Sequence, residues 1–442
     1  MKDSGIKWIG KIPKEWEINK IKYEYRIQTG FTPDTSNNEY YTDENGYTWI
    51  SIADMSNVDN NGEIDESSIM ISEKYINEKH PQIVKKGSLL YSFKLSVGKV
   101  AFAKKDLYTN EAIASFNSDN YLRYLYYAAF LIEENANINI YGAKILNQDL
   151  IKNSITIIPD KKEQKLIASF LDGKVKKINE IIKDLNNQVN ILKKYKKSLI
   201  TEIVTRGLNP NAELKDSGVD WIGMIPKNWE YRKLKYILKN NCNNLKVGPF
   251  GSELSGDDFK DEGYWVYNQR CVLDKNFDNT DVYVNEQKFN ELIGFKVFPD
   301  DILITTRGTI GKVAIVPKNA KTGILHPCLI RFVVDNNLIS NQLVELIFNE
   351  SSIITEQIYR QSNATTIEVI YSYNLKELLL PIIPIEEQQQ IVKYLEKKRR
   401  EIDNLISNKQ MQIEKMEKYK KSLIYEYVTG KRRVKGAEEL YG

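Results

Sequence analysis

The feature that most constrains this chain is an internal repeat. "DSGIKWIGKIPKEWE" begins at Asp3 and "DSGVDWIGMIPKNWE" begins at Asp216, and 14 of the 21 positions counted from each start are identical. The same offset aligns two "GKVA" segments, which begin at Gly98 and Gly311. Between these anchors the two halves diverge almost completely. A repeat of this size predicts two homologous domains, each followed by a shared element.

The shared element is a long heptad helix. In each half, apolar residues recur at alternating steps of four and three, as in the seam of a coiled coil. The predicted seam residues are Leu171, Val175, Ile178, Ile182, Leu185, Val189, Leu192, Leu199 and Ile203 in the first half, and Leu395, Ile402, Ile406, Ile413, Met416, Leu423 and Tyr427 in the second.

A heptad helix cannot bury its apolar stripe alone, so we expect the two helices to pair with each other. Only about eight residues join the end of the first helix to the second copy of the repeat, a reach of at most ~28 Å. A parallel pair would have to cross a helix length of roughly 60 Å, so the antiparallel arrangement is favoured. The predicted organisation is a domain over 1–160, a helix over 161–206, a domain over 207–383, a helix over 384–430 and a tail over 431–442.

Each domain has a mixed pattern. "LLYSFKLSVGKVAFA" and "ILITTRGTIGKVAIV" read as pairs of strands around a Gly-Lys turn, whereas "YLRYLYYAAFLI" and "NQLVELIF" read as helices. We therefore predict the α+β class, with two homologous mixed α/β domains separated by an intramolecular antiparallel two-helix coiled coil of pseudo-twofold symmetry. The strand order stays open.

Composition argues against an active site in this chain. It has only two histidines, at His80 and His326, and its three cysteines, Cys242, Cys271 and Cys328, have neither metal-ligand nor disulfide-framework spacing. Neither a GxGxxG nor a complete Walker A motif is present. With no apolar run of membrane-spanning length, the expected location is the cytoplasm.

The ordered set of motifs resembles the DNA-specificity (S) subunit of type I restriction-modification enzymes. The resemblance covers essentially the whole chain and rests on five features: the two "W-I-G-x-I-P-x-x-W" openings, "TGFTPDTSNNEYY" from Thr29, "VGPFGSELSGDDF" from Val247, the "GKVA" hairpins and the Glu-Gln pairs at Glu163 and Glu387. Each motif alone is weak, but their repetition in the same order is specific.

The resemblance implies a non-catalytic subunit with a role in DNA methylation and phage defence. It implies two target-recognition domains, each reading one half of an asymmetric bipartite site on double-stranded DNA. Two adenine methyltransferase subunits would bring S-adenosylmethionine, and restriction-translocase subunits would bring ATP and Mg. None of these cofactors would bind this chain, and no metal site is expected in it.

Several residues are candidates for contact with DNA. Arg pairs well with guanine and Asn or Gln with adenine, whereas Lys often contacts only phosphate. The candidates are the hairpin residues Lys94, Lys99, Arg307 and Lys312 and the strand-end residues Asn268, Gln269 and Arg270, with Trp49-Ile50-Ser51 in the analogous place of the first half. Solvated turn charges and structural polar residues are the competing interpretation.

Two further sets of residues concern attachment. Trp8, Trp16, Trp221 and Trp229 are expected to anchor the edge of each domain. The repeated "YKKSLI" segments place Tyr195, Lys196, Tyr419 and Lys420 late in each helix, where they could dock a methyltransferase or fix the register of the seam.

A second function class fits part of this pattern. The segments 161–206 and 384–433 carry net charges of +7 and +5, which leaves −8 on the rest of the chain. Acidic domains on a basic helix pair would also suit a coiled-coil adaptor with two protein-binding heads and no nucleic-acid role. That alternative leaves the family motifs unexplained.

Overall fold

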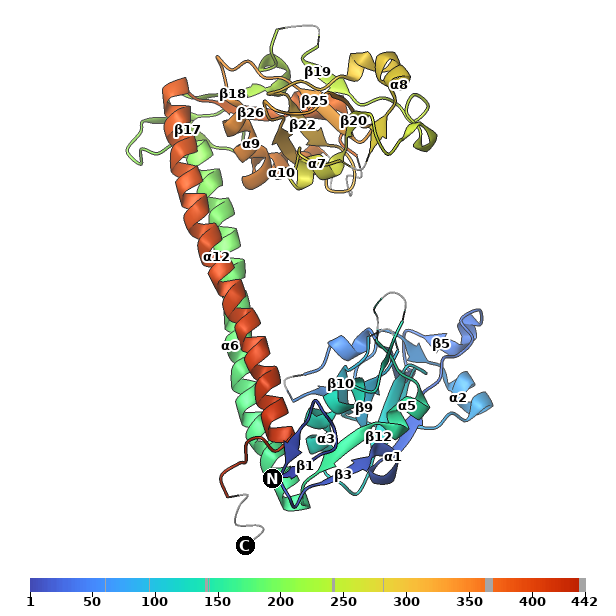
Figure 1. Cartoon of the computed structure of the whole chain (residues 1–442). Helices are drawn as coiled ribbons and strands as arrows, with labels where there is room; N and C mark the ends of the chain where they lie inside the picture. The colour runs from blue at the N-terminus through green and yellow to red at the C-terminus, as the bar shows by residue number, and fades with distance from the viewer. Residues whose placement is uncertain are drawn as a thin grey trace. The chain divides into compact units, whose positions relative to one another are not determined.

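The computed structural model describes residues 1–59, 61–94, 96–139, 142, 144–240, 243–280, 282–361 and 369–436, so Cys242 lies outside the described residues. The chain divides into two units (Figure 1). Unit 1 comprises Met1–Leu185 and Met411–Gly442, and unit 2 comprises Asn186–Gln410.

Unit 1 is built on two sheets. The first has the strand order β4-β12-β9-β10-β7, with bounds Arg26–Thr29, Ile113–Asn117, Leu89–Ser92, Val100–Ala103 and Glu63–Ile64. The second has the order β11-β6-β8-β5, with bounds Tyr108–Thr109, Tyr47–Ile50, Met70–Ile71 and Tyr41–Thr42. Strands β9 and β10 form the antiparallel hairpin that the sequence predicts around the Gly-Lys turn.

Unit 2 repeats this plan with fewer strands. Its first sheet has the order β19-β25-β22-β23, with bounds Leu245–Val247, Leu329–Phe332, Ile302–Thr305 and Val313–Ile315. Its second has the order β21-β20-β24, with bounds Tyr283–Val284, Tyr264–Tyr267 and Gly323–Leu325. The second sheet of each unit contains one parallel strand pair, which is β6 with β11 in unit 1 and β20 with β24 in unit 2. The predicted homology of the two mixed α/β domains is confirmed.

Smaller elements complete the two units. In unit 1 they are β1 (Lys2–Asp3), β2 (Lys11–Ile12), β3 (Glu17–Lys20), α1 (Ile21–Glu24), η1 (Asn38–Tyr40), η2 (Asp54–Ser56), α2 (Glu73–Lys79), α3 (Leu122–Ala128), α4 (Phe130–Glu133), β13 (Asn137–Ile138), β14 (Lys144–Ile145), α5 (Gln148–Asn153) and β15 (Ile155–Ile158). In unit 2 they are β16 (Leu214–Asp216), β17 (Met224–Pro226), β18 (Glu230–Lys233), η3 (Leu234–Tyr236), η4 (Gly256–Asp258), α7 (Gln269–Leu273), α8 (Glu286–Glu291), η5 (Ile293–Phe295), α9 (Asn341–Glu350), α10 (Ile353–Gln361), α11 (Ser372–Glu377) and β26 (Leu379–Ile382).

Two long helices, α6 (Lys161–Arg206) and α12 (Ile385–Val428), lie side by side and antiparallel (Figure 1). In unit 1 the Lys420 Nζ donates to the Asn179 Oδ1 at 3.1 Å, and in unit 2 the Lys196 Nζ donates to the Asp403 Oδ1 at 2.9 Å. The two contacts are 17 residues apart on each helix and follow one another in opposite directions along α6 and α12, as an antiparallel pair of constant register requires. The predicted antiparallel pair is confirmed.

Burial along the predicted seam follows the heptad pattern in the middle of the helices. Eight of its residues are buried, namely Leu171, Ile178, Leu185, Val189, Leu395, Ile402, Ile406 and Leu423, and the others are half-buried. At the end of each helix the most buried position moves by one residue. Val204 is fully buried beside the half-buried Ile203, as is Val428 beside Tyr427. The reason is that the last turns pack into the core of a globular domain as well as against the other helix.

The repeated opening stretch joins each domain to the start of a long helix. In unit 1 the Trp16 indole Nε1 donates to the Glu163 carboxylate at 2.8 Å, and in unit 2 the Trp229 indole donates to Glu387 at 2.9 Å. Both tryptophan side chains are fully buried. The repeat is therefore a structural attachment: an indole fills the core while its N–H satisfies a carboxylate in the first turn of a helix.

The carboxylate in unit 1 has an additional partner. The Arg433 guanidinium, in the tail after α12, donates to both oxygens of Glu163 at 2.9–3.0 Å, and the Glu163 side chain has no exposed surface. The sequence motifs singled out Glu163 only as part of a Glu-Gln pair, so this buried network was not predicted. Among the described residues, no helix is both long and apolar enough to span a bilayer.

We predict that Glu163→Ala lowers the free energy of unfolding by about 3 kcal/mol, because it leaves the buried indole N–H of Trp16 and the half-buried guanidinium of Arg433 without this acceptor. Glu387→Ala should cost about 1–2 kcal/mol, because it removes the acceptor of one indole. Urea unfolding followed by tryptophan fluorescence measures both. The exposed neighbour Glu386→Ala is the control, and equal losses for Glu163 and Glu387 would contradict the prediction.

Candidate nucleic-acid interface

In unit 2 the strands of the first sheet bring two loops to one edge. Strands β19 and β22 are both antiparallel to β25, so they run in the same direction and end together beside Leu329. The segment after β19 carries Phe250, and the turn after β22 carries Arg307. Both side chains are exposed, and that of Phe250 is 76% exposed.

The second sheet contributes two more side chains to the same edge. Strands β20 and β24 are parallel, with Tyr267 paired to Leu325, so Gln269 and His326 follow at neighbouring strand ends. The sheets are joined there, because only residues 326–328 separate β24 of the second sheet from β25 of the first. We call Phe250, Gln269, Arg307 and His326 the unit 2 strand-end cluster.

Glycine makes the close approach of these strand ends possible. A Cβ at Gly248 would overlap the carbonyl of His326, so only glycine lets the loop that carries Phe250 cross this strand end. The Gln269 side-chain nitrogen lies 3.7 Å from the place that a Cβ would take at Gly308, the residue after Arg307. Neighbouring strand ends at this edge therefore carry an exposed cation, an amide and an exposed aromatic ring.

Two neighbours of Gln269 were also predicted to contact DNA. The Asn268 Oδ1 accepts the backbone N–H groups of Arg270 at 2.9 Å and of Cys271 at 3.3 Å, so it caps α7. The Arg270 side chain is exposed at the start of that helix.

The hairpin lysines differ in their surroundings. The Lys99 Nζ donates to the Ile52 carbonyl at 3.2 Å and to the Ser56 Oγ at 2.6 Å, and the Lys312 Nζ donates to the Asn349 carbonyl at 3.0 Å. These contacts hold both amines against their own domain. Their internal bonds give the repeated Gly-Lys pair a structural reason to recur.

Unit 1 has the same strand-end geometry with different side chains. Gly30 takes the place of Gly248, since a Cβ there would overlap the carbonyl of Thr109. The strand-end residues are Thr32, Ser51, Lys94 and Glu111, which we call the unit 1 strand-end cluster. Thr32 donates to the Glu111 carboxylate and Ser51 donates to Asp54 at 2.7 Å, whereas the exposed Lys94 Nζ lies 5.9 Å from the centre of the Phe93 ring.

Trp49, which precedes Ser51 by two residues, is structural. Its side chain is buried, and its indole N–H donates to the Phe31 carbonyl at 2.9 Å. This bond ties the strand β6 to the loop that carries Thr32. Like Trp16 and Trp229, it uses the aromatic ring for packing and the N–H for positioning a neighbouring segment.

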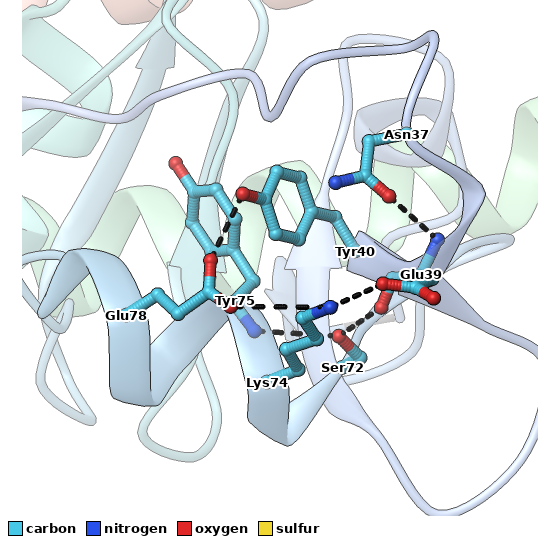
Figure 2. Close-up of polar contacts among 7 residues, drawn as sticks. All are labelled: Asn37, Glu39, Tyr40, Ser72, Lys74, Tyr75 and Glu78. Atoms are coloured by element: carbon cyan, nitrogen blue, oxygen red, sulfur yellow. Dashed lines mark hydrogen bonds and ion pairs between the residues drawn. The ribbon is translucent and has the colours of Figure 1, made fainter.

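A polar network fixes the loop that carries Thr32 (Figure 2). The Lys74 ammonium pairs with the Glu39 carboxylate, the Tyr40 hydroxyl donates to Glu78 at 2.9 Å, and the Ser72 hydroxyl donates to the Glu39 carbonyl at 2.6 Å. These contacts join η1, the turn before β5, to the first helical turns of α2. The segment between β4 and β5 is therefore held at both ends, at Gly30 and at η1.

Burial controls the ionisation of the polar groups at the unit 2 edge. The His326 ring stacks on Phe259 with ring centres 6.1 Å apart, and its Nδ1 lies 2.9 Å from the Cys328 Sγ. Burial lowers the pKa of His326 and raises the pKa of the Cys328 thiol. Both shifts favour the neutral forms, so Arg307 is the charged member of the strand-end cluster. Among the described residues, no group of three or more His, Cys, Asp and Glu side chains could hold a metal ion.

Sequence reasoning singled out Arg307 and Gln269 but missed Phe250 and His326. Phe250 lies in the "VGPFGSELSGDDF" segment, where its neighbours Pro249 and Gly251 were a visible signal of a loop. His326 gave no such signal, because its place depends on the parallel pairing of β20 with β24.

Comparison with known proteins identifies the family. The family model for the type I restriction modification DNA specificity domain matches residues 13–190 and 226–415. The chain therefore belongs to the family of type I restriction-modification DNA-specificity subunits, as the sequence motifs predicted.

Similar proteins cover nearly the whole chain. The MjaX specificity subunit of Methanocaldococcus jannaschii is 27% identical over 97% of this chain and 96% of its own length. The type I restriction enzyme MjaVIII specificity subunit of the same organism is 24% identical over 96% and 95%. One similar solved structure comes from work on the structural basis of complex assembly and conformational transition of the type I R-M system. It has a TM-score of 0.67 at 12% identity, and the match covers 96% of this chain and all of that chain. That likeness shows the fold.

The lowered pKa of His326 predicts a pH dependence of stability. The unfolded chain protonates this ring at an ordinary pKa of about 6.5 and the folded chain only at a lower pH. The stabilising contribution is complete above pH 6.5 and declines as the pH falls toward the folded pKa. We expect the free energy of unfolding to fall less steeply from pH 7 to 5.5 in His326→Asn than in the wild type. Identical pH profiles for the wild type and His326→Asn would contradict this prediction. The variant His80→Asn assigns the NMR signals of the two histidines, so the signal of His326 can be identified.

Proposed function

We propose that the chain is the non-catalytic recognition subunit of a cytoplasmic type I restriction-modification complex and that its units read two unlike halves of one site on double-stranded DNA. The observation that carries this proposal is the pair of strand-end clusters. Two domains share one scaffold, including the crossing glycines Gly30 and Gly248, yet present different side chains at the same strand ends. A repeated scaffold with unlike exposed residues suits two readers of different sequences.

The chemistry of the unit 2 cluster fits base edges in the major groove. The guanidinium of Arg307 matches the O6 and N7 acceptors of guanine, and the amide of Gln269 matches the N6 and N7 groups of adenine. In unit 1, Lys94 is a point charge suited to phosphate or guanine, while Glu111 suits the amino group of cytosine. The two half-sites should therefore differ in sequence.

Methylation and cleavage would reside in partner subunits. Two adenine methyltransferase subunits would bind S-adenosylmethionine, and restriction-translocase subunits would bind ATP and Mg. The scaffolding surface for the methyltransferases includes Tyr195 and Tyr419, whose side chains are 54% and 53% exposed. Their neighbours Lys196 and Lys420 instead bond across the helix pair, to Asp403 at 2.9 Å and to Asn179 at 3.1 Å.

Methylome sequencing of a host that expresses this chain with its partners tests the recognition function. We expect one methylated motif made of two unlike parts around a fixed gap, because two different readers are joined in one chain. Replacing residues 1–160 with the matching segment of another specificity subunit should change one part only. If both parts changed, or neither did, the modular assignment would be wrong, and an absence of any methylated motif would favour the adaptor alternative.

Copurification tests the docking surface. We predict that the double variant Tyr195→Ala and Tyr419→Ala loses most of its methyltransferase partner while its thermal unfolding is unchanged, because both rings face solvent. The matched control is Ile191→Ala with Met411→Ala, since these side chains are 64% and 47% exposed on the same helices but are not repeated between the halves. Equal partner recovery from both double variants would refute docking through the tyrosines.

A further inference from the structure

Phe250 is an exposed ring on a fixed backbone. Its backbone N–H donates to the Glu253 carboxylate at 2.8 Å, and its carbonyl accepts the N–H groups of Glu253 at 2.8 Å and Leu254 at 3.2 Å. On the other side, the Gly248 N–H donates to the Leu329 carbonyl at 2.9 Å. The loop is further anchored by Leu254, whose side chain is buried.

This combination separates Phe250 from an ordinary surface residue. Single exposed apolar side chains are common and need no explanation. Here, however, the side chain has the largest exposed fraction of the large hydrophobic residues that the structure describes. Because its backbone is already ordered, binding through the ring costs little conformational entropy beyond that of the side chain itself.

The neighbours of Phe250 indicate the kind of ligand. It shares the strand-end cluster with the cation of Arg307 and the amide of Gln269, which are the groups that recognise base edges. Aromatic rings stack on bases, and Phe side chains inserted between base pairs unstack the step and kink the duplex. An acidic protein surface would use the cation but offers no flat partner for the ring.

We propose that Phe250 inserts as a wedge between two stacked base pairs of the half-site read by unit 2. This inference rests on the proposed function and deepens it. The wedge unstacks one base step and kinks the duplex there, so unit 2 selects its half-site partly by how easily that step deforms. Flexible pyrimidine–purine steps deform at the lowest cost.

The two half-sites should differ in this respect. Thr32 occupies the place in unit 1 that Phe250 occupies in unit 2, two residues after the crossing glycine. Its hydroxyl is engaged with Glu111, and it has no ring to insert. The distortion is therefore confined to the half-site of unit 2.

The test uses the full chain assembled with its methyltransferase partner and DNA carrying the methylated motif. 2-Aminopurine, whose fluorescence rises on unstacking, is placed in turn at each step of both half-sites except the methylated adenines and their neighbours, because methyltransferases flip the target base out of the stack. We expect enhancement at one step in one half-site. Phe250→Ala should abolish it and weaken binding about 5- to 100-fold, the effect of losing one base–aromatic stack. Phe250→Trp should preserve it.

Tyr236→Ala is the matched control, because this residue is 65% exposed in unit 2 but lies on η3, near the end of β25 opposite to Leu329 and the strand-end cluster. It should leave fluorescence and affinity unchanged. Specific binding by the wild type without any fluorescence change, or with a change that survives in Phe250→Ala, would overturn the wedge and leave the proposed function intact. Failure of the wild-type complex to bind DNA specifically would overturn both.

Discussion

The structure depends on a hydrogen bond between a buried indole and a carboxylate in the first turn of a long helix. It forms twice, from Trp16 to Glu163 and from Trp229 to Glu387. Each bond ties the opening stretch of a domain to a helix that begins about 150 residues later in the chain. A carboxylate in this position also lies in the favourable field of the helix N-terminus. The attachment is thus both packed and electrostatically satisfied, which explains why the opening stretch is repeated while the segments between the anchors are not.

Because of this attachment, the residues that support the fold differ from the residues proposed to recognise DNA. The core of each domain fixes the strand order, and the crossing glycines Gly30 and Gly248 fix how closely the strand ends approach. Side chains beyond those ends, such as Arg307 and Lys94, are exposed. They can change without cost to the core, because surface substitutions usually alter stability by only a few tenths of a kcal/mol. A family of readers can therefore keep one scaffold and vary its targets.

Much of the fold could be predicted from the sequence, because its strongest signals are periodic or repeated. The heptad spacing gave both helices, and the short connection at Gly207 gave their antiparallel direction. The strand order could not be predicted, because the parallel pairs β6 with β11 and β20 with β24 join segments almost 60 residues apart. Local patterns carry no information about such pairing.

The same limit decided which site residues were found. Arg307 follows directly from a hairpin turn, so its exposure could be inferred from neighbouring residues. Phe250 belongs to an apolar residue type that is usually buried, and only its crossing over the end of β24 places it at the edge. The residues proposed to recognise DNA in this fold therefore lie where strands from two sheets end together. The polar members of the cluster can be proposed from residue type. The residues that flank Phe250 indicate only a loop, and its place beside the polar members depends on the packing of Gly248 against His326.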